Sequence, residues 1–192
     1  RIVKLCYLSD MKVCVTNPPW ETKPGYYGIR SNSRWPHVRP DKHLQFPIYL
    51  AYTSSLLKKN GYDVLAFDAV ADELNSEQFI EKLVDEKPDV IFMECSTPSF
   101  EQDISNGLKL KEKGFKVFIF GTHISTFTPE IIEKYKNIDG FIKGEFEYII
   151  KDICDNINDL NSVKGLSYWD NELDKAIINP RAENIENLDD LP

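Results

Sequence analysis

Five short apolar runs, each followed by a segment with helical periodicity, constrain the fold of this chain more than any other feature. The runs cover residues 12–16, 62–67, 89–95, 116–120 and 140–143. They are continuous rather than alternating, which is typical of strands covered on both faces of a parallel sheet. Five strand–helix units in a row predict an α/β fold with a doubly wound five-stranded parallel sheet, Rossmann-like or flavodoxin-like, in the order 2-1-3-4-5.

The segments between the runs carry signals for the ends of helices. Apolar residues recur at helical spacing over 47–61, between a proline and a glycine. Asn75 and Gln78 have the spacing of a capping box and predict the start of the second helix. Thr128 followed by Pro129 predicts the cap and the first turn of the fourth helix.

The pattern changes after about residue 160. Residues 163–169 and 176–179 read as two strands joined by a polar turn, and an acidic segment follows them. We therefore expect residues 1–10 to be an upstream segment or added sequence, residues 11–160 to form one domain, and residues 161–192 to form a β-hairpin and a linker.

Composition narrows the classes of partner. The chain has 192 residues, a hydrophobic fraction of 42% and a formal net charge of −8. The negative charge argues against nucleic acid or an anionic membrane surface as a partner, and no apolar stretch approaches the ~20 residues of a membrane span. Cys6, Cys14, Cys95 and Cys154 lie far apart, which favours buried thiols in a reducing cytoplasm.

Polar residues and small residues follow the predicted strands. Ligands of doubly wound sheets bind at the carboxyl ends of the strands, where helix N-termini present free N–H groups, so these residues predict a pocket along that edge. The candidate binding residues are Asn17, Pro18, Ser96, Thr97, Pro98, Ser99, Gly121, Thr122, His123, Gly144 and Glu145.

Each candidate also has a purely structural interpretation. Asn17, Thr97 and Ser99 are residue types that cap helices. Gly121 is suited to a tight turn, and Glu145 can complement a helix dipole. The convergence of several strand ends on one edge is what favours the pocket.

Two common kinds of site are poorly supported. A phosphate-binding loop needs clustered glycines after the first strand, and residues 16–19 contain none. Nucleophilic catalysis by Ser96 and His123 would require an acidic residue to orient the histidine, and none is evident. The sequence therefore assigns no catalytic residue and no metal ligand, and His123 either contacts a ligand or only hydrogen-bonds within its loop.

The connection from Trp20 to Gln45 is about 25 residues long and has no periodicity. It carries an excess of positive charge in an otherwise acidic chain. Loops of this length are usually functional or disordered, so this one is either a lid over the first strand or a surface loop.

Taken in order, several phrases resemble the N-terminal cobalamin-binding domain of the B12-dependent radical SAM enzymes. They are Val-Thr-Asn-Pro-Pro at 15–19, Pro-Asp-Val-Ile at 88–91, Gly-Thr-His at 121–123, Lys-Gly-Glu-Phe-Glu at 143–147 and Asn-Leu-Asp-Asp-Leu-Pro at 187–192. The resemblance covers residues 11–192. It implies cobalamin as the cofactor of this chain, and a radical SAM domain with a 4Fe-4S cluster and S-adenosylmethionine in the full-length protein.

The resemblance also implies roles for the candidate residues. The nucleotide tail of cobalamin would pass near Ser96, Thr97 and Gly121, while Asn17 and Pro18 would border the corrin. In this reading the full-length enzyme is a methyltransferase that acts through methylcobalamin, and the chain alone binds without turning over.

Two positions depart from related B12 domains. Residues 17–20 lack the histidine that ligates cobalt in the methionine-synthase type, and Phe146 replaces a glycine common in the family. The alternative function is a Rossmann-like substrate-recognition or protein-interaction module that binds no cobalamin.

Overall fold

A computed structural model describes residues 11–23, 26–27 and 46–192 of the chain. The predictions for residues 1–10 and for most of the 20–45 connection lie outside the described residues. The described part of that connection contains a short antiparallel pair of strands, β2 (Glu21–Lys23) and β3 (Tyr26–Tyr27), which the absence of periodicity did not predict.

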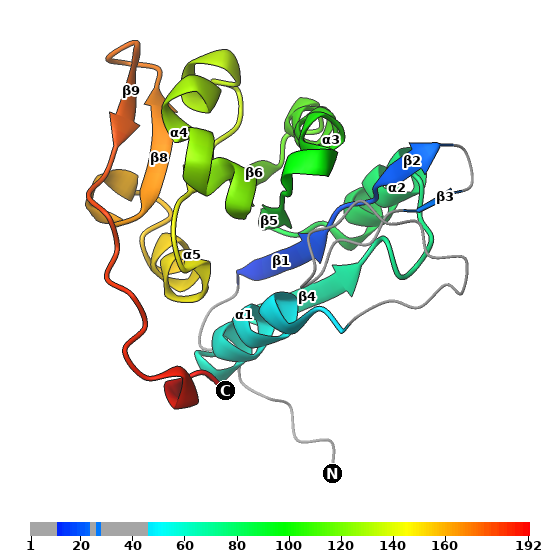
Figure 1. Cartoon of the computed structure of the whole chain (residues 1–192), viewed down its shortest axis with the longest axis horizontal. Coiled ribbons are helices and arrows are strands. Elements are labelled where there is room, and N and C mark those ends of the chain that lie inside the picture. The colour runs from blue at the N-terminus through cyan, green and yellow to red at the C-terminus, as the bar shows by residue number, and fades with distance from the viewer. Residues whose placement is uncertain (1–10, 24–25, 28–45) are drawn as a thin grey trace.

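A mixed sheet forms the centre of the molecule (Figure 1). Within the described residues it has seven strands in the order β4-β1-β5-β6-β7-β8-β9. The first five are parallel to one another, while β8 pairs with β7 and with β9 in the antiparallel sense. The bounds are β1 Lys12–Asn17, β4 Asp63–Asp68, β5 Val90–Glu94, β6 Lys116–Phe120, β7 Gly140–Ile142, β8 Leu166–Asp170 and β9 Lys175–Ile178.

The α/β class and the parallel core are confirmed, and the sheet has two antiparallel strands in addition to the five parallel strands predicted. The hairpin near the C-terminus joins the sheet instead of standing beside it. Its β8 pairs Leu166 with Ile142 of β7, and Lys143 N–H donates to the Gly165 carbonyl at 2.8 Å. Because β7 offers a free row of backbone N–H and C=O groups at the end of the parallel strands, the hairpin satisfies them and extends the sheet.

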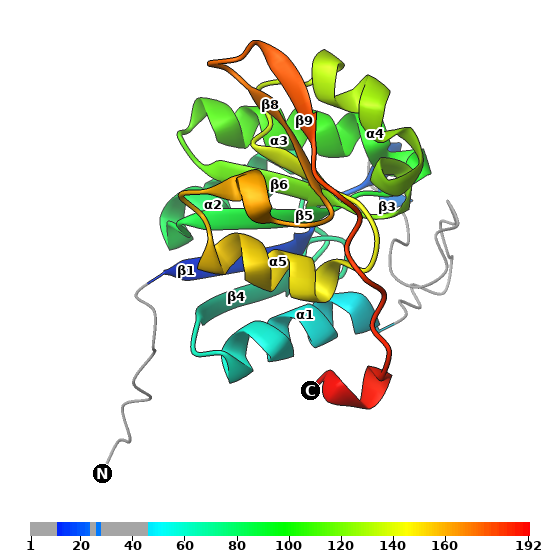
Figure 2. The same cartoon turned by 90° about the vertical axis from the view of Figure 1, so that its left-hand side faces the viewer.

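Helices cover both faces of the sheet. The helices α2 (Ser76–Glu86), α3 (Phe100–Glu112) and α4 (Thr122–Lys134) pack on one face, and α1 (Ile48–Lys59) and α5 (Phe146–Asp155) lie side by side on the other (Figure 2). Successive residues of β5 enter opposite cores: Ile91 and Met93 join one apolar cluster, and Val90 and Phe92 join the other. All four are fully buried, as the continuous apolar run predicts.

The helix starts are confirmed in one case and wrong in another. Asn75 Oδ1 accepts the Gln78 N–H at 2.9 Å, and Gln78 Oε1 accepts the Asn75 N–H at 3.0 Å, which forms the predicted capping box. By contrast, α4 begins at Thr122, and the predicted cap at Thr128 lies inside it. The chain turns directly from β6 into α4 because Gly121 adopts a φ of 122°, a conformation open to glycine.

The C-terminal segment runs from the hairpin across α5 toward α1 and contains the short 3-10 helix η3 (Leu188–Asp190) (Figure 2). Two further 3-10 helices are η1 (Thr97–Ser99), directly before α3, and η2 (Leu160–Ser162), before the hairpin.

Cys14, Cys95 and Cys154 are buried free thiols, as predicted, and Cys6 lies outside the described residues. No helix in the described ranges is long and apolar enough to cross a membrane.

Candidate functional site

The ends of four parallel strands lie level with one another. Thr16 of β1 pairs with Met93 of β5, Glu94 pairs with Phe120 of β6, and Phe120 pairs with Ile142 of β7. The residues that follow these strands therefore form one row, which we call the carboxyl edge. Every candidate binding residue predicted from the sequence lies in this row or in the turn that follows it.

Asn17 ends β1 with a buried side chain. The residue is 1% exposed, and its Nδ2 has no hydrogen-bond partner among the described residues. Its backbone is satisfied, since the Asn17 carbonyl accepts the Ala69 N–H at 3.0 Å. No helix begins at this residue, so Asn17 is not the helix cap that its residue type allowed. Pro18, the next residue, is also buried.

Ser96 and Ser99, which follow β5, belong to a buried hydrogen-bonded chain. Their hydroxyl oxygens lie 2.8 Å apart, and Ser99 Oγ donates to Asp103 Oδ2 at 2.7 Å. The three residues are 4%, 1% and 0% exposed. Neither serine side chain caps the helix that follows it. Their hydroxyls instead hold a buried carboxylate of α3.

Asn106 lies about one turn beyond Asp103 along α3 and does not join this hydrogen-bonded chain. Residues 99, 103 and 106 are spaced so that they share one face of the helix. Asn106 is 1% exposed, and neither its Nδ2 nor its Oδ1 has a partner among the described residues. An unsatisfied buried polar group costs about 1–3 kcal/mol. We call Ser96, Ser99, Asp103 and Asn106 the buried polar row.

Sequence reasoning missed the deeper half of the buried polar row. Asp103 and Asn106 lie within α3, on either side of Ile104 and Ser105, and neither was among the candidate binding residues. Their helical spacing from Phe100 and Gly107 could have shown that they face the sheet. Polar residues at such core positions need hydrogen-bond partners, so this spacing could have marked them as candidates.

The glycine at the end of β6 is required by the fold itself. Gly121 has φ 122° and ψ −175°, a region that is essentially restricted to glycine. A Cβ at this position would lie 2.1 Å from the carbonyl oxygen of Cys95, the residue directly after β5. The close approach that the glycine permits is therefore to the backbone of residue 95, and no cofactor tail is needed to explain it.

His123 bridges two turns of the carboxyl edge. Its Nδ1 lies 3.3 Å from Thr97 Oγ1, and its ring lies 4.0 Å from the Phe100 ring between centroids. Burial lowers the pKa of His123, and the negative charge of Glu101 opposes this in part. Thr97 and Pro98 are exposed, and Thr122 is half-buried. These side chains are open to a ligand.

The turn after β7 forms the last part of the carboxyl edge. Gly144 and Glu145 are exposed, and the Gly144 N–H donates to Ser125 Oγ at 3.3 Å. Glu145 lies at the start of α5 but its side chain does not cap the helix. Its Oε2 accepts the backbone N–H of Ile185 in the C-terminal segment. Glu145 therefore ties that segment to the carboxyl edge.

Phe146, which replaces the family's glycine, connects the carboxyl edge to α1. Its ring lies 4.4 Å from that of Phe120, the last residue of β6, and 5.9 Å from that of Tyr49 in an edge-on contact. The three rings form an aromatic bridge from the sheet to the first turn of α1.

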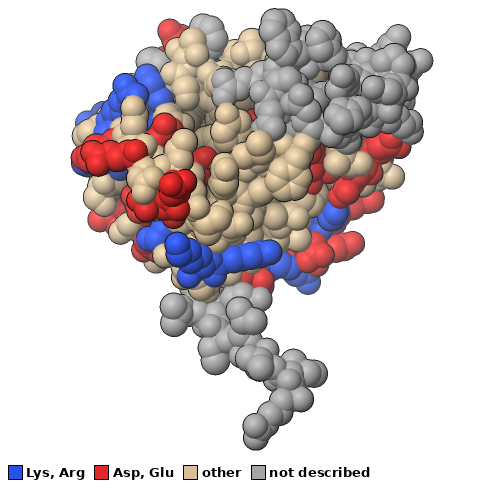
Figure 3. Space-filling model, turned by 60° about the horizontal axis from the view of Figure 1, so that its bottom comes forward, with Lys and Arg blue, Asp and Glu red and all other residues tan. Residues whose placement is uncertain are grey.

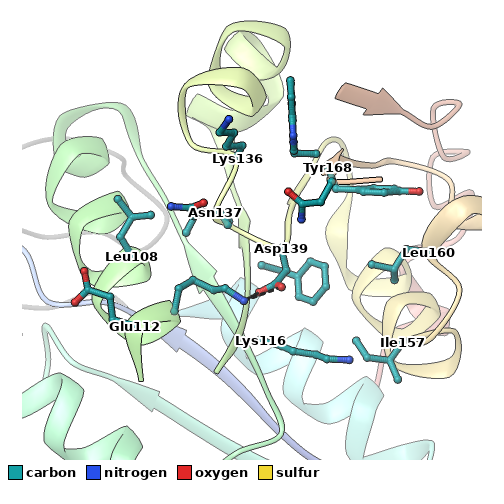
Figure 4. A pocket seen from close by; sticks show the side chains of 14 residues that line it. Leu108, Glu112, Lys116, Lys136, Asn137, Asp139, Ile157, Leu160 and Tyr168 are labelled. Carbon is teal, nitrogen blue, oxygen red and sulfur yellow. Dashed lines mark hydrogen bonds and ion pairs between the residues drawn. The ribbon is translucent and has the colours of Figure 1, made fainter. Parts of the chain in front are cut away.

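A cavity lies at the opposite, amino-terminal edge of the strands (Figure 4). It has a volume of about 640 Å³ and includes none of the predicted site residues. Lys111 Nζ forms an ion pair with Asp139 at 2.7 Å, and Asp139 also accepts the Val117 N–H at 2.6 Å. Because this pair already anchors the start of β6, we assign these charges a structural role.

Comparison with known proteins identifies the family. The model of the B12 binding domain matches residues 41–153, which is more than half of the chain. An anaerobic magnesium-protoporphyrin IX monomethyl ester cyclase of Rubrivivax gelatinosus is 26% identical over 86% of this chain and 30% of its own length. The uncharacterized methyltransferase PH0819 of Pyrococcus horikoshii is 28% identical over 76% of this chain and 32% of its own length.

A solved structure shares the fold. The cobalamin-dependent S-adenosylmethionine radical enzyme OxsB, with aqua-cobalamin bound, superposes with a TM-score of 0.69 at 18% identity, over 90% of this chain and 22% of OxsB. The chain thus spans about a third or less of the proteins it matches. With level strand ends, a polar carboxyl edge and a family match over most of the sheet, this chain belongs to the B12 binding domain family.

Proposed function

We propose that this chain is the cofactor domain of a longer B12-dependent radical SAM methyltransferase, and that cobalamin occupies its carboxyl edge. The observations that carry the proposal are two buried groups without a hydrogen-bond partner among the described residues of a B12-family domain: Asn17 Nδ2 at the end of β1, and the Asn106 amide on the inward face of α3. Buried polar groups normally have partners, and amides without them fit a ligand that supplies hydrogen bonds.

The corrin would lie against the open part of the carboxyl edge. Cobalamin carries amide side chains around a largely apolar ring, so it needs both hydrogen-bonding groups and uncharged surface. Thr97, His123 and the turn at Gly144 offer these groups at the surface. Burial lowers the pKa of His123, so its imidazole is neutral at pH 7 and able both to donate and to accept.

The nucleotide tail would be held by the buried polar row. Ser96 and Ser99 stand at its entrance, and Asp103 fixes the direction of the Ser99 hydroxyl at 2.7 Å. Asn106 would then offer its free amide to the inner end of the tail. Ser96 and Ser99 have small side chains, which would take up little of the space beside a bulky ligand.

When bound, the cofactor supplies the methyl group to be transferred. The residues of this chain bind and orient it, and they exclude water from its buried tail. We assign no catalytic residue to residues 11–192. The 4Fe-4S cluster and S-adenosylmethionine would belong to the part of the protein that follows.

We also propose the division of the chain. Residues 11–160 form the cobalamin-binding domain, and residues 161–192 form a hairpin and a linker toward a radical SAM domain in the same chain. The net charge of −8 and three buried thiols fit a cytoplasmic protein with a small-molecule cofactor and no nucleic-acid partner.

Cofactor retention tests the proposal. The protein is incubated with hydroxocobalamin and desalted, and its visible spectrum is recorded. We expect about one corrin per chain in the parent protein and at least a ten-fold lower retention in Asn106→Leu, which removes the free amide. Asn137→Leu, the same change at the opposite edge of the sheet, should retain as much corrin as the parent.

Each outcome has a separate meaning. If the parent protein retains no corrin at saturating cofactor, the proposed function is refuted and an interaction module without cobalamin takes its place. If Asn106→Leu retains as much as the parent, cobalamin binding stands and the placement of the tail along the buried polar row is wrong.

A further inference from the structure

The first helix after β1 carries large apolar and aromatic side chains on its outer side. Residues 48–57 of α1 contain no charged side chain, in a chain whose charged fraction is 28%. On the side turned away from the sheet, Ile48, Tyr49 and Tyr52 are 39%, 37% and 40% exposed, and Phe46 just before the helix is 69% exposed. We call these four residues the α1 outer face.

Such a surface is unusual for a helix of a complete globular protein. Surface helices normally turn charged and polar residues outward, and a helix that is apolar all round is normally buried. The exposed positions of α2 follow the rule, since they include Glu77, Glu81 and Asp85. Val84, which is 38% exposed, stands among those charges.

An uncharged area lies on this side of the molecule, with charged residues along part of its border (Figure 3). In Figure 3, which brings the α1 side of the molecule forward, a continuous area without charged side chains spreads between acidic and basic residues. Contiguous exposed apolar area with a polar border is typical of an interaction site.

The C-terminal segment leads to this same side. In both Figure 1 and Figure 2 the C-terminus lies beside α1. Leu191 is 9% exposed although it is the penultimate residue, and Leu188 of η3 adds a side chain that is 68% exposed. Whatever follows Pro192 therefore starts its path next to the α1 outer face.

We infer that the α1 outer face is the surface on which the part of the protein after Pro192 docks. This inference rests on the proposed function, which assigns a radical SAM domain to that part. The matched relatives align with this chain over only 30% and 32% of their lengths, so the remaining part is large enough to bury such a face.

Docking at this face would also reach the cofactor. Tyr49 belongs to the α1 outer face and contacts Phe146, whose ring in turn contacts Phe120 at the end of β6. The aromatic bridge thus joins the docking surface to the carboxyl edge. A domain seated on α1 would therefore lie next to the carboxyl edge.

The test uses the complete protein with Tyr52→Glu, and Val84→Glu as the matched control. Both replace a helical apolar residue of nearly equal exposure, 40% and 38%, with the same charge. The rate of proteolytic cleavage between residues 179 and 192 is measured together with corrin retention. We expect at least ten-fold faster cleavage in Tyr52→Glu, cleavage at the parent rate in Val84→Glu, and corrin retention within two-fold of the parent in both.

Ile48→Ser, a milder change on the same face, gives the same comparison if Tyr52→Glu does not fold. Equal cleavage rates in the α1 variants and Val84→Glu overturn the inference. Loss of corrin without faster cleavage also overturns it, because the face would then belong to the cofactor site. The inference is also overturned if the parent protein is a dimer that Tyr52→Glu dissociates without faster cleavage between residues 179 and 192, because the face would then bind a second copy of the chain.

The two proposals fail separately. If the parent protein retains no corrin, the proposed function is lost, while the cleavage comparison still decides whether α1 carries a docked domain.

Discussion

Replacing the unpartnered amide of α3 should stabilise the protein while it weakens cofactor binding. Asn106 is 1% exposed, and neither polar atom of its side chain has a partner in the described part of the chain. Leucine keeps the branched shape of asparagine and has no polar atom. The substitution Asn106→Leu therefore removes a desolvation cost from the cofactor-free state.

The expected gain follows from that cost. Leaving one buried polar group unsatisfied costs about 1–3 kcal/mol, and an apolar side chain of the same shape avoids it. Leucine is somewhat bulkier than asparagine, and overpacking can cost about 1–3 kcal/mol. The relief of two unsatisfied polar atoms outweighs the cost of one overpacked side chain, so we expect the free energy of unfolding to rise by about 2 kcal/mol. For a domain of this size that corresponds to about 4–8 °C in Tm.

The assay is thermal unfolding followed by circular dichroism, with and without cobalamin. Cobalamin should raise the Tm of the parent protein, because a ligand that binds only the folded state stabilises it. The rise should be smaller in Asn106→Leu than in the parent. Asn106→Ala separates the two effects, since it also removes the amide but leaves a cavity in place of apolar contacts.

Two results would refute this reasoning. If cofactor-free Asn106→Leu melts below the parent, the amide already has a partner that stabilises the fold, such as a buried water. If cobalamin raises the Tm of Asn106→Leu as much as that of the parent, Asn106 makes no contact with the cofactor.

Three further predictions concern the carboxyl edge. Gly121→Ala should destabilise the fold by more than about 3 kcal/mol, because its Cβ would overlap the Cys95 carbonyl oxygen at 2.1 Å; a Tm within 2 °C of the parent, an allowance of about 0.5 kcal/mol, would contradict this. Burial lowers the pKa of His123 below its usual value of 6.5, so stability should fall as the pH drops through 6.5. An NMR titration of the His123 imidazole with a midpoint at or above pH 6.5 would contradict the lowered pKa and the pH dependence that follows from it. Glu145→Ala should speed amide exchange at Ile185 about five-fold, because one hydrogen bond to a carboxylate is lost; an unchanged rate would mean that other contacts hold the segment.

The parallel part of the fold could be predicted because its strands carry their own signal. The buried runs at 116–120 and 140–143 end within one residue of β6 and β7. Strands in a parallel sheet are buried on both faces, so their apolar residues form a continuous run that can be recognised in the sequence. The extent of the sheet could not be predicted, because it depends on which segments lie side by side in three dimensions. The sequence showed a hairpin at 163–179, but only the free edge of β7 decides that this hairpin joins the sheet.

The surface of the site was predictable and its interior was not. Ser96, Ser99 and Gly121 were identified because polar or small residues directly after a strand are visible in sequence. The structure gives these residues other roles than those first predicted. Gly121 allows a close approach to the backbone of residue 95, and the two serines form a hydrogen-bonded chain that ends at the Asp103 carboxylate. Asp103 and Asn106 lie within a helix whose other inward residues are mostly apolar, and only the three-dimensional position shows that the Asp103 carboxylate is buried.

Glu145 links the two surfaces to which we assign binding. Its carboxylate lies at the carboxyl edge and accepts the N–H of Ile185, in the segment that runs on to the side of α1. A carboxylate has two oxygens, so one can hold the linker while the other meets a ligand. If the proposed cofactor engages Glu145, it would strengthen or release the contact between Glu145 and Ile185. Amide exchange at Ile185 with and without cobalamin distinguishes these cases, because independent surfaces would leave that rate unchanged.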